Sequence, residues 1–255
     1  MTISKAWIED RAEELKASLA FCTRLPLLRE TPIGGSALAR ASWAFPVAGL
    51  IVGLIGAIVY AVAHKVGLPA WPAAALAVVA TLLATGCLHE DGLADTADGF
   101  GGGTTREQKF DIMRDSRTGA YGVCALVLSL LLRVSVLASL PNAHLIVWAL
   151  IASHAAARAT MPVLMFLLPP ARSDGLSFEA GHPPGDSVTA AAVLGILILA
   201  FCLHPGRGVL ALIVLLIVIA LMTWLSMRQV EGQTGDVLGA LEQVSEIAVL
   251  LVALG

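Results

Sequence analysis

Seven long apolar stretches dominate the chain, and shorter segments rich in charge, glycine and proline separate them. The stretches cover residues 43–63, 70–88, 119–140, 145–168, 188–203, 209–227 and 237–254. An α-helix rises about 1.5 Å per residue, so most of them can cross the roughly 30 Å hydrocarbon core of a bilayer, although the fifth is short. The pattern predicts an all-α, polytopic integral membrane bundle of about seven transmembrane helices.

The composition agrees with a membrane location. Hydrophobic residues make up 57% of the 255 residues and charged residues only 14%, whereas soluble domains average about 45–50% and about 25%. No internal repeat or low-complexity linker interrupts the chain, so residues 1–255 are predicted to form a single domain surrounded by membrane lipid. The charged residues form no basic patch with interleaved aromatic residues, so a nucleic-acid partner is not expected.

Residues 1–40 precede the first apolar stretch and are charged throughout. They lack the short apolar core and small-residue cleavage site of a signal peptide, so we expect them to stay attached and cytoplasmic. Apolar residues at helical spacing predict an amphipathic helix that ends before Pro26. This helix fits the membrane interface and packing on the bundle about equally well. Its apolar positions are Ile8, Ala12, Leu15, Leu19 and Cys22.

The lysine and arginine residues predict the orientation of the chain. If successive loops alternate between the two sides and the amino terminus is inside, twelve basic residues lie inside and only Lys65 and Arg207 lie outside. Positive residues concentrate on the cytoplasmic side of membrane proteins. The amino terminus and the polar motifs described below are therefore predicted to be cytoplasmic.

The first span contains three glycines, Gly49, Gly53 and Gly56, at intervals of four and three residues. Such a stripe lets the backbone of another helix approach closely. We interpret it as a packing feature.

Residues 89–118 form a polar segment between two apolar stretches, predicted to be an acidic, glycine-rich active-site loop. Asp91, Asp95 and Asp98 are spaced i, i+4, i+7 and share one face if the second span continues as a helix. Their mutual repulsion requires a cation, and Mg²⁺ prefers hard carboxylate oxygens. We expect these residues and the adjoining Glu90 to bind Mg²⁺. The alternative is a solvated acidic helix end or a calcium-like loop.

Basic residues follow the acidic cluster. The run MRDSRTGAYG places four polar side chains, those of residues 114–117, together at the mouth of the third span, and the planar guanidinium of arginine suits phosphate oxygens. A role in topology alone is an alternative for the neighbouring Arg106 and Lys109. The residues predicted to contact substrate are Arg24, Arg114, Ser116, Arg117, Arg158 and Gly235.

The last span opens with Gly235 and Asp236 and carries Glu242 and Glu246 in its apolar part. Ionised groups inside a membrane are costly and are functional candidates by default. A structural ion pair with Arg133 or Arg158 is the alternative interpretation of the two glutamates.

The assembled motifs resemble those of the cobalamin synthase family, whose members are adenosylcobinamide-GDP ribazoletransferases. The resemblance covers nearly the whole chain. In family order, the chain contains FCTRLP, FPVAGLIVG, HEDGLADTADGFGGG, IMRDSRTGAYG, AAARA and GQTGDVLGA.

The resemblance implies a bacterial inner-membrane enzyme that joins adenosylcobinamide-GDP to α-ribazole, or to its 5′-phosphate, and releases GMP with the help of Mg²⁺. Transfer of this kind depends on charge neutralisation and in-line placement. We expect Asp98, Asp115 and Asp236 to take part in catalysis, with either Asp115 or Asp236 accepting the hydroxyl proton.

Two other functions remain open at this level. The element Asp-x-x-Asp-Gly at residues 95–99, with Asp111 and Asp115 after it, partly matches the signature of CDP-alcohol phosphotransferases. An ion transporter would use Glu242, Glu246 and Arg133 along a pathway, although most polar residues gather at one face. The sequence leaves the oligomeric state open, including a homo-oligomer.

Overall fold

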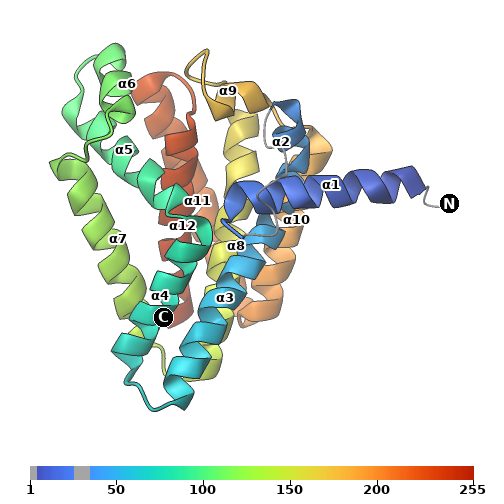
Figure 1. The fold of residues 1–255 in the computed structure, drawn as a ribbon, viewed down its shortest axis with the longest axis vertical. Coiled ribbons are helices and arrows are strands. Elements are labelled where there is room, and N and C mark those ends of the chain that lie inside the picture. Colours follow the sequence, from blue (N-terminus) through green and yellow to red (C-terminus); the bar gives the residue numbers. More distant parts are fainter. Residues whose placement is uncertain (1–4, 26–34) are drawn as a thin grey trace.

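The computed structural model describes residues 5–25 and 35–255 as a bundle of helices (Figure 1). Its elements are α1 (Lys5–Cys22), α2 (Ser36–Ala41), η2 (Ser42–Ala44), α3 (Phe45–Lys65), α4 (Ala70–Thr85), α5 (Leu88–Gly102), α6 (Arg106–Arg114), α7 (Ala120–Ser139), α8 (Ala143–Leu167), α9 (Leu176–Ala180), α10 (Gly185–Cys202), α11 (Pro205–Val230) and α12 (Gly235–Leu254).

The helices α8 and α12 form the centre of the bundle. Most residues of these two helices are buried, whereas α7, α10 and α11 leave most of theirs exposed. The exposed residues are apolar, as expected for a surface that meets lipid rather than water. One end of the bundle carries α6 and α9, and the other carries the α3–α4 connection and the C terminus (Figure 1).

The predicted membrane bundle is confirmed, with one correction at the second span. Within the described residues, six helices are long and apolar enough to cross a membrane, and α4 with α5 makes a seventh if a bent pair counts as one span. The two helices meet at 90°. Gly86 and Cys87 both adopt the left-handed conformation, with φ of 67° and 60°, which ends α4. The predicted span 70–88 is therefore too long.

The polar segment 89–118 is mostly helical, so its prediction as a loop is wrong. It contains most of α5 and all of α6, and α6 begins with a capping box in which Thr105 and Gln108 satisfy each other's backbone N–H groups. The three aspartates of α5 are thus on a helix, but on one that turns away from the second span.

The glycine stripe in α3 is confirmed as a packing feature. A Cβ atom on Gly49 would lie 2.2 Å from the backbone oxygen of His154, and one on Gly53 would lie 2.5 Å from that of Leu150. Gly56 faces Thr81 of α4 instead. The backbones of α3 and α8 are therefore in direct contact along two turns.

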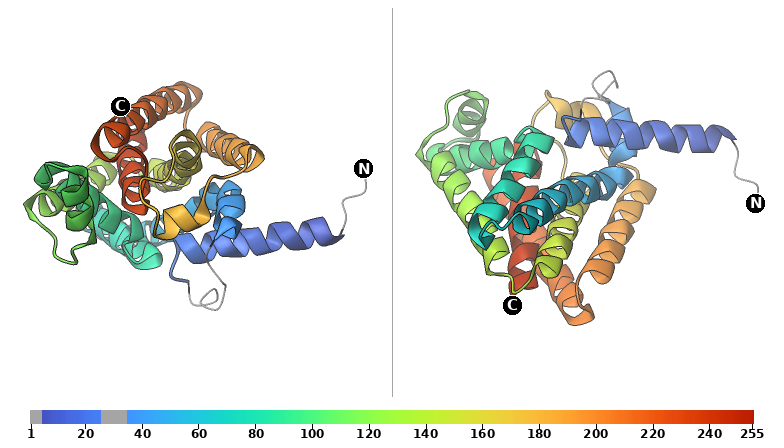
Figure 2. Two further views of the ribbon diagram at one scale, coloured as in Figure 1. Left: turned by 90° about the horizontal axis from the view of Figure 1, so that it is seen from above. Right: turned by 60° about the horizontal axis from the view of Figure 1, so that its bottom comes forward.

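The amino-terminal helix projects sideways from the bundle (Figure 2). It ends at Cys22, as predicted from the FCTRLP segment. Ala17, Ser18 and Cys22 are buried, whereas Ile8 is 55% exposed. Only the second half of α1 packs on the bundle, so the predicted apolar face is used in part.

The interior consists of two apolar cores with a polar layer between them. On α12, Val249 and Leu250 belong to one core and Leu238 and Leu241 to the other. Glu242 and Glu246 lie between the two sets along the same helix. This arrangement separates the charged groups of the spans from the polar end of the bundle.

Candidate active site

A cavity lies where the ends of α1 and α8 meet the starts of α3, α5 and α12, and α2, α9 and the α11–α12 connection complete its lining. Its polar lining includes Asp91, Arg172, Asp174 and Asp236, and part of the remainder is apolar. It therefore has the concave form and the few convergent polar groups expected of a substrate site.

The connection after α8 carries Arg172 to the cavity. Residues 169–171 pair with Gln233 of the α11–α12 connection: the Ala171 N–H donates to the Gln233 carbonyl (2.8 Å), and the Gln233 N–H donates to the Pro169 carbonyl (2.9 Å). Arg106 of α6 also donates to the Ala171 carbonyl (2.5 Å). These bonds hold the segment in place although it belongs to no helix.

Close approach of α5 and α12 brings their aspartates to the same cavity. A Cβ atom on Gly92 would lie 2.8 Å from the Asp236 carbonyl, and one on Gly239 would lie 3.1 Å from the His89 carbonyl. Thr234 caps α12 by accepting from the Val237 N–H (3.2 Å). Asp236 lies in the first turn of α12, where the helix dipole favours a negative charge.

Arg172 lies beside these carboxylates. Its Nη2 atom is 3.4 Å from Asp236 Oδ2, and its guanidinium also packs over the ring of Phe110, 5.6 Å from the centroid. The electrostatic field at Asp95 receives contributions from Asp91, Asp98 and Asp236, and also from Arg172. The site is thus an acidic patch with one arginine at its edge.

The carboxylates of Asp91 and Asp95 have no hydrogen-bond or ion-pair partner within the described part of the chain. Asp91 lines the cavity and is exposed, and Asp95 is half-buried. They do not form a closed ligand cage, because the only group of three or more side chains with ligand atoms within 4.8 Å, among the described residues, is His154, Glu242 and Glu246. An open pair of carboxylates still suits Mg²⁺, which is commonly held by one or two carboxylates, waters and substrate phosphates.

Asp98 has a different role from the predicted one in metal binding and catalysis. Its Oδ2 atom accepts from the Gly119 N–H (2.7 Å) and its Oδ1 atom from the Gly122 N–H (2.9 Å). Asp98 therefore caps the N-terminus of α7, where free N–H groups attract an anion. The geometry does not support it as a ligand of the cavity.

Glu90 and Arg158 also lie elsewhere than predicted. Glu90 Oε1 is 2.8 Å from Arg133 Nη1, and Arg158 Nη1 is 2.6 Å from Glu242 Oε1, with all four side chains buried. Both residues belong to the polar layer between the two cores. Neither residue lines the cavity, so the roles predicted for Glu90 in metal binding and for Arg158 in phosphate binding stay predictions.

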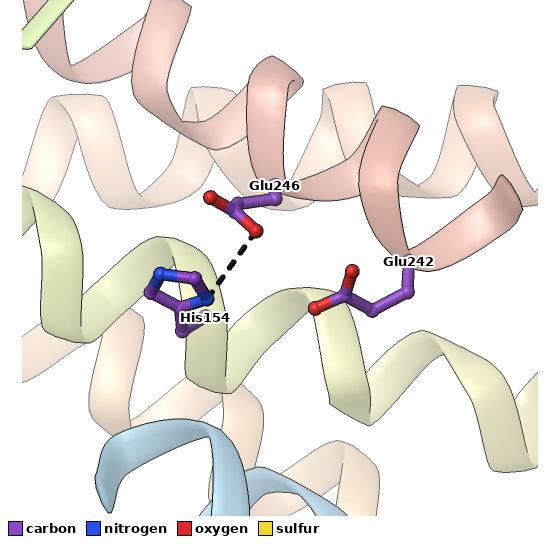
Figure 3. A group of neighbouring side chains, drawn as sticks. All are labelled: His154, Glu242 and Glu246. Atoms are coloured by element: carbon purple, nitrogen blue, oxygen red, sulfur yellow. Dashed lines mark ion pairs between the residues drawn. The ribbon is translucent and has the colours of Figure 1, made fainter. Parts of the chain in front are cut away.

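The polar layer contains a group with the spacing of a metal site (Figure 3). His154 Nδ1 lies 3.2 Å from Glu246 Oε2, and Arg133 Nε lies 2.8 Å from Glu246 Oε1. Arg133 and Arg158 thus already pair with the carboxylates, and a divalent cation would add charge between two guanidinium groups. The predicted ion pairs of Glu242 and Glu246 with the two arginines are confirmed.

The remaining predicted residues lie outside the cavity lining. Arg114 pairs with Asp174 (2.6 Å), and Arg117 pairs with Asp115 (2.6 Å) in an exposed connection. Hydrogen bonds from Arg117 lower the pKa of Asp115 to about 2. Ser116 is exposed in the same connection, and Arg24 covers Gly86 at the α4–α5 break.

Among the predicted site residues, Asp91, Gly235 and Asp236 line the cavity, and Asp95 is near it. The residues missed from the sequence are Arg172, Ser177 and Gln233. The sequence contains a signal that could have indicated Arg172. Its segment, PPARSDG, follows the fourth span and is assigned to the same side of the membrane as the acidic segment 89–118.

The comparisons with known proteins decide the family. The sequence profile of cobalamin-5-phosphate synthase matches residues 14–254. The chain belongs to this family. Its relatives include the adenosylcobinamide-GDP ribazoletransferase of Bradyrhizobium diazoefficiens, which is 54% identical over 240 residues (94% of this chain and 92% of the relative). The protein of that name from Mesorhizobium japonicum is 55% identical over 253 residues (99% and 96%), and the one from Brucella ovis is 38% identical over 246 residues (92% and 93%). No solved structure matches this member of the family significantly.

Proposed function

We propose that this chain is a multi-pass membrane transferase that joins adenosylcobinamide-GDP to α-ribazole, or to its 5′-phosphate, with release of GMP. The observation that carries the proposal is a cavity lined by Asp91, Asp236 and Arg172, with Asp95 nearby, in a chain whose relatives at 54% and 55% identity bear the name of this activity. Diphosphate cleavage needs groups of both signs, because metal and phosphate charges must be balanced.

The donor set of the cavity fits Mg²⁺. Asp91 and Asp95 offer hard oxygens that no described residue occupies, and Mg²⁺ held by one or two carboxylates keeps sites for phosphate oxygens and water. The ion would neutralise the charge that develops on the diphosphate during transfer. We assign its binding to Asp91 and Asp95.

In the reaction, Arg172 would hold the diphosphate by donating from its guanidinium to the phosphate oxygens. A ribazole hydroxyl attacks the phosphorus atom next to cobinamide, the bond from this phosphorus to the GMP oxygen breaks, and GMP leaves with the electron pair. Asp236 would accept the hydroxyl proton, because it lines the cavity beside Arg172. Asp115 is a poor candidate for this role, since a group with a pKa of about 2 is a weak base near neutral pH.

We further propose that the chain resides in the bacterial inner membrane with the cavity facing the cytoplasm. The loops at the cavity end carry most of the basic residues, whereas Lys65 and Arg207 lie at helix ends that the sequence assigns to the opposite side. The substrates would then reach the site without crossing the bilayer.

The direct test incubates the purified, detergent-solubilised protein with adenosylcobinamide-GDP, α-ribazole and Mg²⁺ and measures GMP and the joined corrinoid product. We expect GMP to appear only when both substrates and Mg²⁺ are present. Asp91→Asn should reduce turnover severely, because it removes a charge that no other group replaces.

Asp111→Asn is the matched control. Asp111 is an exposed aspartate of α6, outside the cavity, so its loss should leave turnover unchanged. Absence of GMP from the wild-type protein in the complete mixture would refute the activity. Equal activity of Asp91→Asn and wild type at limiting Mg²⁺ would refute only the assignment of the metal.

A further inference from the structure

The cavity lining also has an apolar part, which we call the apolar half. It is lined by six large apolar side chains, Phe21, Leu38, Phe45, Met161, Met165 and Phe178. Phe21 stacks on Phe45, with ring centroids 5.7 Å apart. An aromatic and thioether lining of this kind favours a flat apolar ring system, because rings stack on phenylalanine and contact methionine sulfur favourably.

One buried donor of the cavity lining has no partner among the described residues. Gln233 is 1% exposed and lines the cavity, and its side-chain oxygen accepts from the Ser177 hydroxyl. Its Nε2 donor makes no hydrogen bond to any described residue. A buried donor without a partner is costly, so a ligand that supplies one acceptor would be favoured here.

We propose that this apolar half binds the base of the ribazole substrate, with Gln233 Nε2 donating to the unsubstituted ring nitrogen of its benzimidazole. The assignment rests on the proposed function. A benzimidazole riboside has a planar bicyclic base with a single free acceptor nitrogen, which matches one donor in an otherwise apolar lining. Its ribose would extend toward Asp91 and Asp236, where the hydroxyl reacts.

Guanine is a poorer occupant of the same space. It carries several donors and acceptors on its edges, and most of them would be left without partners among the phenylalanine and methionine side chains. The cavity therefore distinguishes the two nitrogenous bases by polarity. The guanosine part of the other substrate is expected to lie outside the apolar half.

Phe178 occupies a favourable place for closing over the base. It is 48% exposed and belongs to the five-residue helix α9. The flanking Gly175 and Gly181 have positive φ angles of 84° and 71°, which favour glycine. We expect the Phe178 ring to stack on the bound base.

The test compares two ribosides with purified protein in steady-state assays: one with benzimidazole, and one with indole, which lacks the acceptor nitrogen. Wild type should prefer benzimidazole in kcat/KM by about three- to tenfold, the effect of one neutral hydrogen bond. Gln233→Met keeps the length of the side chain but loses the donor, so this preference should disappear. The ratio of the kcat/KM values for the two ribosides, measured with one variant, is independent of how much of that variant folds.

Phe178→Ala should raise the KM for the riboside by up to about tenfold and leave the KM for adenosylcobinamide-GDP unchanged. Phe166→Ala is the matched control, since Phe166 is similarly exposed (51%) but does not line the cavity. If the Phe178 variant instead raises the KM for adenosylcobinamide-GDP alone, the apolar half holds guanine and the proposal is wrong. An unchanged benzimidazole preference in Gln233→Met also overturns it, whereas a wild-type protein without any turnover would refute the proposed function itself.

Discussion

At the scale of single residues, the polar layer is nearly balanced in charge. Three carboxylates, Glu90, Glu242 and Glu246, face two guanidiniums, and the imidazoles of His89 and His154 complete the layer. Gln243 links the parts by donating to Glu90 (3.1 Å) and Glu242 (3.0 Å). Removing one member of such a layer leaves its partner charged, buried and unpaired, which is the costly outcome.

Arg133→Gln should therefore lower the free energy of unfolding by about 3–5 kcal/mol, because Glu90 and Glu246 lose their shared cation. Thermal or denaturant unfolding in detergent measures the change. Arg117→Gln is the control: Arg117 is 87% exposed, and surface pairs contribute little. A similar loss of stability in both variants would contradict the structural role of the buried layer.

Asp115 provides a prediction about pH. Arg117 lowers its pKa to about 2, so the stabilisation from this pair is present above the ordinary pKa of 3.8 and is lost only as the pH falls through about 2. Asp115 consequently stays ionised between pH 5 and 9. In a plot of kcat/KM against pH, we expect the acidic limb of Asp115→Asn to lie at the same pH as that of the wild type. A displaced limb would restore Asp115 as a candidate base.

At the scale of elements, the contact between α3 and α8 depends on glycine. Gly53 allows α3 to touch the Leu150 carbonyl, and His154 of the polar layer is on the next turn of α8. Larger side chains at this contact would push α3 away from α8, the helix that carries His154 and Arg158. The packing of α3 and the charge pairing of α8 are therefore coupled.

Gly53→Leu should lower the free energy of unfolding by at least about 1–3 kcal/mol, the range typical of overpacking. The atoms that the new side chain meets belong to the backbone of α8, which cannot move aside as side chains do. Unfolding of the purified protein in detergent measures this. Gly185→Ala at the start of α10 should be neutral, since a Cβ atom there meets nothing within 4 Å. Unchanged stability of Gly53→Leu would mean that the two helices are further apart than described.

At the scale of the whole molecule, the proposed orientation can be tested in intact cells. Thr104 lies between α5 and α6, at the cavity end, and Pro141 lies between α7 and α8. In a background without the native cysteines, a membrane-impermeant thiol reagent should label Pro141→Cys and spare Thr104→Cys. Permeabilised cells should show labelling of both, and the opposite pattern in intact cells would invert the topology.

Much of this architecture could be predicted from the sequence, because apolar length and helical periodicity are local properties. The spans at residues 119–140 and 237–254 differ from α7 and α12 by at most two residues at each end. The 90° break was missed, since Cys87 is an ordinary residue in a left-handed conformation and only the fold imposes it there.

The candidate site was predicted less completely, for a related reason. Asp91 and Asp236 stand out as carboxylates beside apolar stretches. Arg172 and Gln233 act through a pairing between two connections that are 60 residues apart, which no local pattern reveals. Arg117 is near the aspartates in sequence, but the fold does not bring it to the cavity lining.

The break between α4 and α5 has a consequence for biosynthesis. α4 contains 16 residues and no ionisable side chain, whereas α5 carries Glu90, Asp91, Asp95 and Asp98. Insertion by the translocon costs about 2.5–3.5 kcal/mol for an aspartate at the centre of a helix. Because the chain turns through 90° after Thr85, the neutral α4 can be inserted without the acidic α5 continuing along the same axis. A single turn thus allows one continuous chain to enter the membrane while Asp91, at the start of α5, stays exposed at the cavity.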